Sequence, residues 1–223
     1  PFIGTPGNFK RTSNRHDYAI DPAAETLLDK IVKSGGEVYG IGKIKDIFNG
    51  KGISNFATTK SNMDGMQKTL AAVHEFTSSR VMSLRGEAEA ISSTNQQMNK
   101  STNERHLIFT NLVDFDMLWG HRRDVQAYYN GLKEFDNFLP NFFDAMADDD
   151  ILFITADHGC DPTYTVHTDH TREYVPLLVF GKKLKKGVNL GIRKTFADLG
   201  QTIAELFGIK KLKNGTSFRK EII

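Results

Sequence analysis

The sequence predicts an α/β domain, in which apolar strands alternate along the chain with amphipathic helices. Short apolar runs, such as those at residues 106–113 and 151–156, alternate with segments in which apolar residues recur every three or four positions. Acidic and histidine residues follow directly after both of these runs. The chain has 223 residues, of which 39% are hydrophobic, so it is long enough to bury a sizeable core.

The first half of the chain begins with an expected helix over residues 22–33, whose apolar residues lie on one face. Asp21 stands in the N-cap position, Pro22 suits the first helical position, and Gly35 ends the helix. A strand is expected next, over residues 37–44. A helix followed directly by an apolar strand is typical of the alternation in α/β domains.

A second helix is expected over residues 63–76, with Ser61 or Asn62 as its cap. The segment that follows, residues 77–105, is polar and rich in Ser, Thr, Asn and Gln. We expect it to be a surface insertion, either a loop or a short helix near residues 87–91.

The second half contains the longest expected helix, over residues 124–147, between the two apolar runs. Pro140 is expected to kink this helix. A strand over residues 175–180 and a final helix over residues 195–207, closed by Gly208, complete the chain. The apolar positions that predict the long helix are Val125, Tyr128, Leu132, Phe135, Leu139, Phe142 and Met146.

Candidate metal ligands follow both apolar runs. Asp116 and His121 come after the first, and Asp157, His158 and His170 come after the second. Carboxylate oxygens and neutral imidazoles suit Mn²⁺, Zn²⁺ or Fe²⁺. The 41 residues from Asp116 to Asp157 leave room for one crossover helix between neighbouring parallel strands, so the ligands are expected to meet at one sheet edge. Together they make a two-metal site nearly complete.

Simpler interpretations of the same residues stay open. An Asp that follows a strand is often a helix N-cap, and the glycines beside it can mark turns. His167 is an alternative to His170 as a ligand. Asp114, Asp161 and Asp169 are expected to orient the ligating imidazoles.

Two segments carry a resemblance to a known family. Residues 110–123 (TNLVDFDMLWGHRR) and 155–178 (TADHGCDPTYTVHTDHTREYVPLL) resemble the metal-binding segments of prokaryotic phosphopentomutases, which belong to the alkaline phosphatase superfamily. The FDMLWGHRRD and DHTREYVP stretches make the match specific. The likeness extends to residues 1–20, 40–48, 61–66 and 213–218.

The resemblance implies an enzyme that interconverts (deoxy)ribose 1-phosphate and (deoxy)ribose 5-phosphate through a phosphothreonine. It implies two Mn²⁺ ions, with Mg²⁺, Zn²⁺ or Co²⁺ as substitutes. Asp116, His121 and His170 would hold one ion, and Asp157 and His158 the other. The nucleophilic threonine and one further Asp are expected upstream of this chain, so no catalytic nucleophile is assigned within it.

The resemblance also implies a domain organisation. Residues 1–20 would be the end of a cap domain and the cap–core junction, a remnant of that domain. Residues 21–223 would be the C-terminal part of an alkaline phosphatase-like core sheet with flanking helices, here incomplete. Arg11, Arg15 and Lys43 are expected to contact the substrate phosphate, although a solvated loop and an ordinary strand-end cation are the alternatives.

Two other functions fit the same features. One is a metal-dependent phosphatase of the same superfamily, in which water takes the phosphate. The other is a catalytically inactive metal-binding fragment that lacks the nucleophile.

The resemblance implies a small-molecule pentose phosphate as the partner, and the composition gives no sign of a nucleic acid or membrane partner. The net charge of +2 provides no basic field for nucleic acid. No apolar stretch approaches the roughly 18 residues of a membrane span. The single cysteine, Cys160, excludes an intramolecular disulfide and fits a reducing cytoplasm. The sequence does not indicate an oligomeric state.

Overall fold

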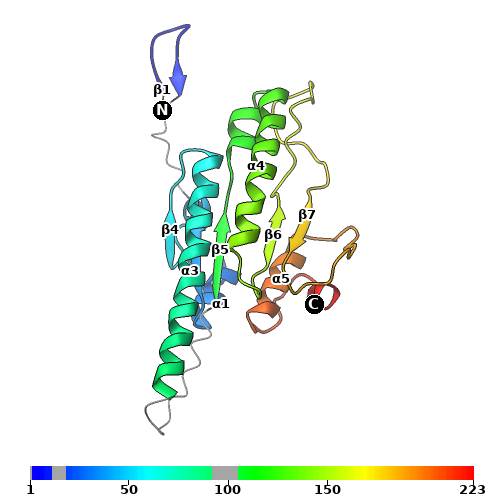
Figure 1. Ribbon diagram of the computed structural model, residues 1–223. Helices are drawn as coiled ribbons and strands as arrows, with labels where there is room; N and C mark the ends of the chain where they lie inside the picture. The colour runs from blue at the N-terminus through cyan, green and yellow to red at the C-terminus, as the bar shows by residue number, and fades with distance from the viewer. Residues whose placement is uncertain (1, 12–18, 92–104) are drawn as a thin grey trace.

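The computed structural model describes residues 2–11, 19–91 and 105–223 of the chain. Strands and helices alternate along it, and the predicted α/β class is confirmed (Figure 1). In chain order the elements are β1 (Phe2–Ile3), β2 (Lys10–Arg11), α1 (Leu27–Lys33), β3 (Glu37–Ile41), α2 (Ile44–Ile47), β4 (Asn55–Ala57), α3 (Asn62–Ile91), β5 (His106–Thr110), the π-helix η1 (Phe115–Gly120), α4 (Val125–Ala145), β6 (Leu152–Thr155), β7 (Leu177–Phe180), α5 (Ala197–Leu206) and α6 (Arg219–Ile222).

A parallel sheet with the strand order β4-β3-β5 lies at the centre. The register between β3 and β5 runs from Glu37 opposite His106 to Ile41 opposite Thr110. Because these strands are parallel, their carboxyl ends lie at the same edge of the sheet. The loops that follow β3 and β5 therefore start side by side.

The strand predicted over residues 151–156 is present as β6, but its expected pairing was wrong. Within the described part of the chain β6 pairs with β7, antiparallel, with Leu152 opposite Phe180, and does not pair with β5. The connection from β6 to β7, residues 156–176, reverses the chain so that the two strands run antiparallel. β5 and β6 nevertheless point in the same direction (Figure 1), so both deliver their following loops to the same end of the molecule.

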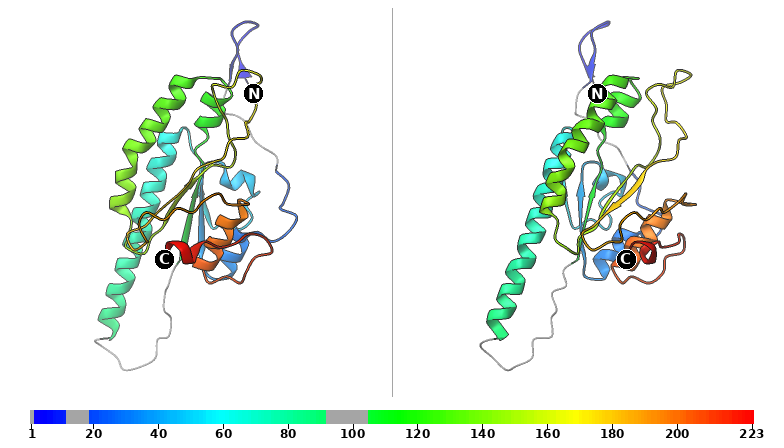
Figure 2. Two further views of the ribbon diagram at one scale, coloured as in Figure 1. Left: turned by 90° about the vertical axis from the view of Figure 1, so that its right-hand side faces the viewer. Right: turned by 45° about the vertical axis from the view of Figure 1, so that its right-hand side comes forward.

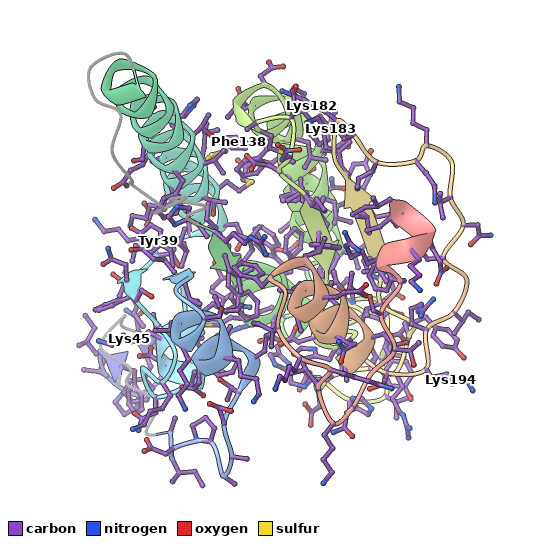
Figure 3. The ribbon with its side chains drawn as sticks, turned by 90° about the horizontal axis from the view of Figure 1, so that it is seen from below. Tyr39, Lys45, Phe138, Lys182, Lys183 and Lys194 are labelled. Atoms are coloured by element: carbon purple, nitrogen blue, oxygen red, sulfur yellow. The ribbon has the colours of Figure 1, made fainter. Side chains whose placement is uncertain are left out.

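Helices cover the strands on both faces. Seen from below, α3 and α4 lie on one side and α1 and α5 on the other (Figure 3). The turned views show the same layers edge-on (Figure 2). The hydrophobic core on the α1 side is built on Leu28, Ile31 and Val38, against which Leu107 and Ile203 pack.

The helix predicted over residues 22–33 starts later, at Leu27. Thr26 is its N-cap: its hydroxyl accepts from the Asp29 N–H at 3.2 Å, and the Asp29 carboxylate accepts from the Thr26 N–H at 2.8 Å. This capping box satisfies two backbone donors at once, whereas Asp21 and Pro22 offer no such pair. Asp21 accepts instead from the Asn49 side chain at 2.7 Å.

The strand predicted over residues 37–44 ends earlier, at Ile41. Gly42 has a φ of +84°, and a Cβ there would lie 2.6 Å from the Asn111 carbonyl oxygen. Only glycine tolerates both the left-handed conformation and this close approach. The chain therefore turns at Gly42 and enters α2.

Helix α3 runs well past the predicted end at residue 76. Residues 77–91, expected to belong to an insertion that is either a loop or a short helix near residues 87–91, continue the helix to Ile91. Ala, Leu, Arg and Glu are strong helix formers and occur in this stretch, which explains the continuation. The rest of the predicted insertion, apart from residue 105, lies outside the described residues.

The later helices agree closely with their predictions. The Asp124 side chain accepts from the Ala127 N–H at 2.9 Å and so caps α4, which continues through Pro140. Helix α5 ends before Gly208, whose φ is +70°. No helix in residues 2–11, 19–91 and 105–223 combines the length and the apolar character needed to cross a bilayer.

Candidate metal centre

The π-helix η1 follows β5 and carries the first predicted ligand. The His121 N–H, at the residue after η1, donates to the Asp116 carbonyl at 3.1 Å, a bond between residues five apart. Such a bond brings residue i+5 over residue i, and single π-turns of this kind occur frequently at functional sites. Trp119 anchors the turn on α4, because its ring lies directly over Gly131.

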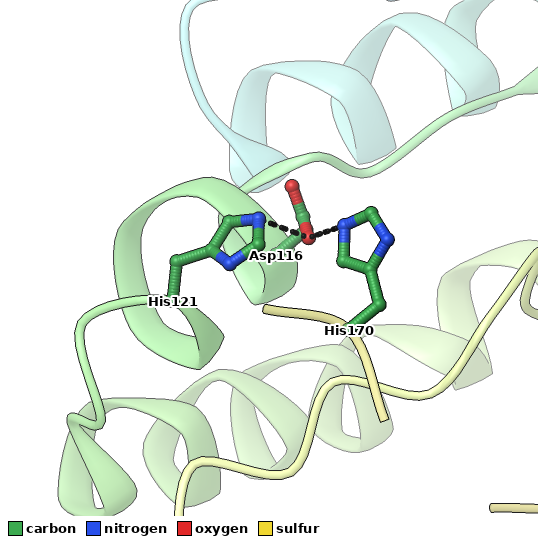
Figure 4. A group of neighbouring side chains, drawn as sticks. All are labelled: Asp116, His121 and His170. Carbon is green, nitrogen blue, oxygen red and sulfur yellow. Dashed lines mark ion pairs between the residues drawn. The ribbon is translucent and has the colours of Figure 1, made fainter. Parts of the chain in front are cut away.

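Asp116, His121 and His170 converge at this turn (Figure 4). The Asp116 Oδ1 atom lies 3.1 Å from His121 Nε2 and 3.1 Å from His170 Nε2. All three ligand atoms lie within 4.8 Å of one another. The two histidines come from segments that are far apart in the sequence, so the tertiary fold builds the group.

The donor set fits a divalent cation. Asp116 Oδ1 is buried and makes no hydrogen bond of good geometry to any described residue. Two imidazole nitrogens nevertheless face it at 3.1 Å. A cation among the three atoms would satisfy them together, and one carboxylate with two imidazoles is a common ligand set for transition metals.

A backbone contact selects the tautomer of the neutral His121 ring. Its Nδ1 atom lies 2.5 Å from the Thr168 carbonyl oxygen. A carbonyl oxygen can only accept, so Nδ1 carries the proton and Nε2 keeps its lone pair for a metal. A carbonyl group behind the ring is a usual way to orient a ligating histidine.

His158 lies against this group but does not join it. Its ring stacks on the His170 ring with centroids 3.6 Å apart. His158 Nε2 is 3.7 Å from Asp157 Oδ2, and the Asp157 side chain is 73% exposed. Asp157 and His158 therefore lie beside the three-residue group and stay predicted ligands.

Cys160 packs the second loop against η1. A Cβ added to Gly120 would lie 2.4 Å from Cys160 Sγ, so glycine is required for this approach. Burial, together with the negative charge of Asp116, raises the pKa of the Cys160 thiol to about 11.

Two of the three residues expected to orient the imidazoles have other partners. Asp114 accepts from the Asn62 N–H at 2.6 Å. Asp161 accepts from the Thr163 hydroxyl and from the Thr163 N–H, both at 2.7 Å, and these hydrogen bonds lower the pKa of the Asp161 carboxyl. The bond at Asp161 is local, whereas Asp114 and Asn62 are 52 residues apart in the sequence. Asp169 accepts from the His170 N–H at 2.8 Å and so does border the site.

The alternative ligand, His167, lies apart from the group. Its Nδ1 atom accepts from the Asp169 N–H at 3.2 Å, and its ring contacts Tyr164. This arrangement favours His170 as the ligand.

The predicted substrate contacts are placed only in part. Lys43 precedes α2 at the carboxyl end of β3, the sheet edge from which η1 also departs. Arg11 lies in β2, but its side chain is outside the described part of the structure, and so is Arg15 as a whole.

Two groups that support the candidate metal centre were not predicted from the sequence. The Thr168 carbonyl is a backbone group and leaves no signal in the residue type. Asn62 was considered only as a helix cap, whereas its partner Asp114 is 52 residues away. Only the three-dimensional fold connects them.

The sequence was compared with protein-family models and with known proteins, and both comparisons point to metal-dependent enzymes. The family model described as the metalloenzyme superfamily matches residues 5–211. A phosphopentomutase of Desulfitobacterium hafniense (strain DSM 10664 / DCB-2) is 51% identical over 223 residues, which are 100% of this chain and 50% of that protein. The phosphopentomutases of Carboxydothermus hydrogenoformans and Clostridioides difficile (strain 630) are 49% and 48% identical, with the same coverage. The chain spans about half the length of the curated relatives it matches, their C-terminal half.

Proposed function

Because the chain belongs to the metalloenzyme superfamily, we propose that it supplies the metal-binding half of a phosphopentomutase. The enzyme would interconvert ribose or deoxyribose 1-phosphate and the corresponding 5-phosphate. Relatives named phosphopentomutase, about 50% identical along the whole of this chain, support the proposal. The observation that carries it is the convergence of Asp116, His121 and His170 on one point.

The ligand assignment has two parts. Asp116, His121 and His170 would hold one divalent ion, which we propose to be Mn²⁺, with Mg²⁺, Zn²⁺ or Co²⁺ as substitutes. Asp157 and His158 would contribute to a second ion, whose remaining ligands come from outside this chain. The stacking of His158 on His170 supports a second ion close to the first.

The proposed chemistry is phosphate transfer through a phosphothreonine whose threonine lies outside this chain. A bound metal pair would stabilise the negative charge that develops on the transferred phosphate. Within this chain, the Thr168 carbonyl holds the His121 ring in its ligating orientation. Lys43, Arg11 and Arg15 would hold the phosphate of the substrate, and residues 1–20 would belong to a cap that excludes water.

The test uses the complete polypeptide that the gene encodes, with Mn²⁺ and ribose 1-phosphate. Phosphorus NMR would follow both the 5-phosphate and free phosphate. We expect the 5-phosphate to accumulate without release of phosphate. Stoichiometric release with no isomer would identify a metal-dependent phosphatase instead, and metal binding without turnover would identify an inactive metal-binding protein.

The remaining assignments depend on the same proposal. We propose a pentose phosphate as the partner and a cytoplasmic location, which the single cysteine fits. The proposed core domain covers residues 21–223.

A further inference from the structure

Two buried polar residues form a closed ring of hydrogen bonds directly before η1. The Asn62 N–H donates to Asp114 Oδ2 at 2.6 Å, and the Asp114 N–H donates to Asn62 Oδ1 at 2.9 Å. Asn62 is 3% exposed and Asp114 is 5% exposed. Water therefore does not compete for these bonds, and the carboxylate strengthens the shorter one.

Each of the two side chains accepts a hydrogen bond from the backbone of the other segment and not from its own helix. Asp114 occupies the N-cap position of η1, but its side chain makes no capping bond to η1. Asn62 opens α3, while the Ser61 hydroxyl accepts from the Asp64 N–H and caps that helix. The ring thus resembles a capping box formed between two segments instead of within one.

The ring lies immediately before the metal ligands. Asp114 precedes Asp116 by two residues, and the next backbone bonds of the turn run from Met117 N–H to the Val113 carbonyl and from His121 N–H to the Asp116 carbonyl. The backbone of Asp114 therefore sets where the first turn of η1 begins. The 3.1 Å distances from Asp116 Oδ1 to both imidazoles depend on that starting point.

The side-chain amide of Asn62 lowers the stability of the fold, so packing alone does not explain why an asparagine stands here. Its Nδ2 atom is buried and has no hydrogen-bond partner among the described residues. An unsatisfied buried donor destabilises a fold, and an apolar side chain of similar size would avoid it. The acceptor on the same side chain, which holds the Asp114 N–H, offsets that cost.

We infer that Asn62 and Asp114 are positioning residues that set the affinity of the metal site. The inference rests on the proposed metal site, since the ring acts through Asp116. Partners behind metal ligands typically change metal affinity by about 10- to 100-fold when they are lost. Neither residue touches the metal in this scheme.

The first experiment compares Asn62→Ala with the unchanged protein. Binding of Mn²⁺ to the complete polypeptide would be followed by the loss of the free Mn²⁺ signal in electron paramagnetic resonance, and the melting temperature would be measured in parallel. We expect the Kd for Mn²⁺ to rise about tenfold or more, because Asp116 loses its fixed position.

A remote variant separates positioning from general destabilisation. Thr202 is fully buried, and its hydroxyl accepts from the Phe218 N–H at 3.0 Å and donates to the Asp198 carbonyl at 2.8 Å. Thr202→Val should lower the melting temperature and leave the Kd for Mn²⁺ unchanged. If Asn62→Ala leaves the Kd unchanged, or if Thr202→Val raises it equally, the positioning role is disproved.

A swapped double variant keeps the test decisive if Asn62→Ala does not fold. Asn62→Asp combined with Asp114→Asn preserves one carboxylate, one amide and both acceptors. We expect its Kd for Mn²⁺ to stay within about threefold of that of the unchanged protein, because both hydrogen bonds of the ring behind Asp116 can still form. A double variant that folds but whose Kd for Mn²⁺ is at least about tenfold higher would also overturn the inference. Failure of the unchanged protein to bind Mn²⁺ would count against the proposed function itself.

Discussion

The His158 ring lies flat against the His170 ring, with centroids 3.6 Å apart and an interplanar angle of 20°. His170 belongs to the group that includes Asp116, and His158 follows β6 directly. Both histidines lie in the connection between β6 and β7, residues 156–176, so the stack holds the beginning of this loop against its later part. The two candidate ligand sets therefore lie side by side.

This arrangement predicts that His158→Ala changes how many ions bind. The substitution removes a proposed ligand of the second ion and leaves the other group intact. We expect bound Mn²⁺, measured by plasma mass spectrometry after dialysis of the complete polypeptide, to fall from about two ions per chain to about one. His167→Ala is the matched control and should retain both ions. Two ions in the His158 variant would exclude this histidine as a ligand.

Asp116 is predicted to be the central ligand, since its Oδ1 atom faces both His121 and His170. Asp116→Asn keeps the size of the side chain and removes its charge. We expect the Kd for Mn²⁺ to rise about 100-fold or more, beyond the usual effect of losing a residue behind a ligand. Isothermal titration calorimetry would measure it. Asp161→Asn, a carboxylate in the same region that bonds to Thr163, should bind Mn²⁺ normally.

The start of α1 allows a test of local structure. Thr26→Ala removes the hydroxyl of the capping box, and we expect a loss of about 0.5–2 kcal/mol in the free energy of unfolding. Asp21→Ala, at the position first expected to cap the helix, should change it by less than about 0.5 kcal/mol, as exposed substitutions usually do. Urea denaturation of the two variants would measure both values. A larger effect at Asp21 would contradict the observed cap.

These results show where sequence reasoning succeeds and where it fails. Periodicity and capping predicted α4 almost to the residue, because Asp124 and the apolar positions of that helix act locally. The Asp–His motifs identified Asp116, His121 and His170 as candidates for the same reason. Local rules do not specify that β6 pairs with β7, or that η1 is a π-helix. Asn62 and Asp114 meet only because the sheet brings the start of α3 to the end of β5.

The contact between Gly120 and Cys160 leads to the last prediction. A Cβ at Gly120 would lie 2.4 Å from Cys160 Sγ and 2.8 Å from the Phe115 carbonyl oxygen, and a backbone oxygen cannot move aside without opening η1. We expect Gly120→Ala to destabilise the protein by about 1–3 kcal/mol. It should also weaken Mn²⁺ binding, because the turn that carries Asp116 must shift.

The matched control for Gly120→Ala is another glycine within a helix. At Gly200 in α5 the nearest atom to an added Cβ is Leu27 Cδ2, at 3.9 Å, so alanine fits there without strain. Gly200→Ala should stabilise the protein by about 0.5–1 kcal/mol, since alanine loses less backbone entropy in a helix than glycine. Thermal and urea unfolding of both variants would give opposite signs. Equal effects would mean that the close approach of Cys160 to η1 does not constrain the turn.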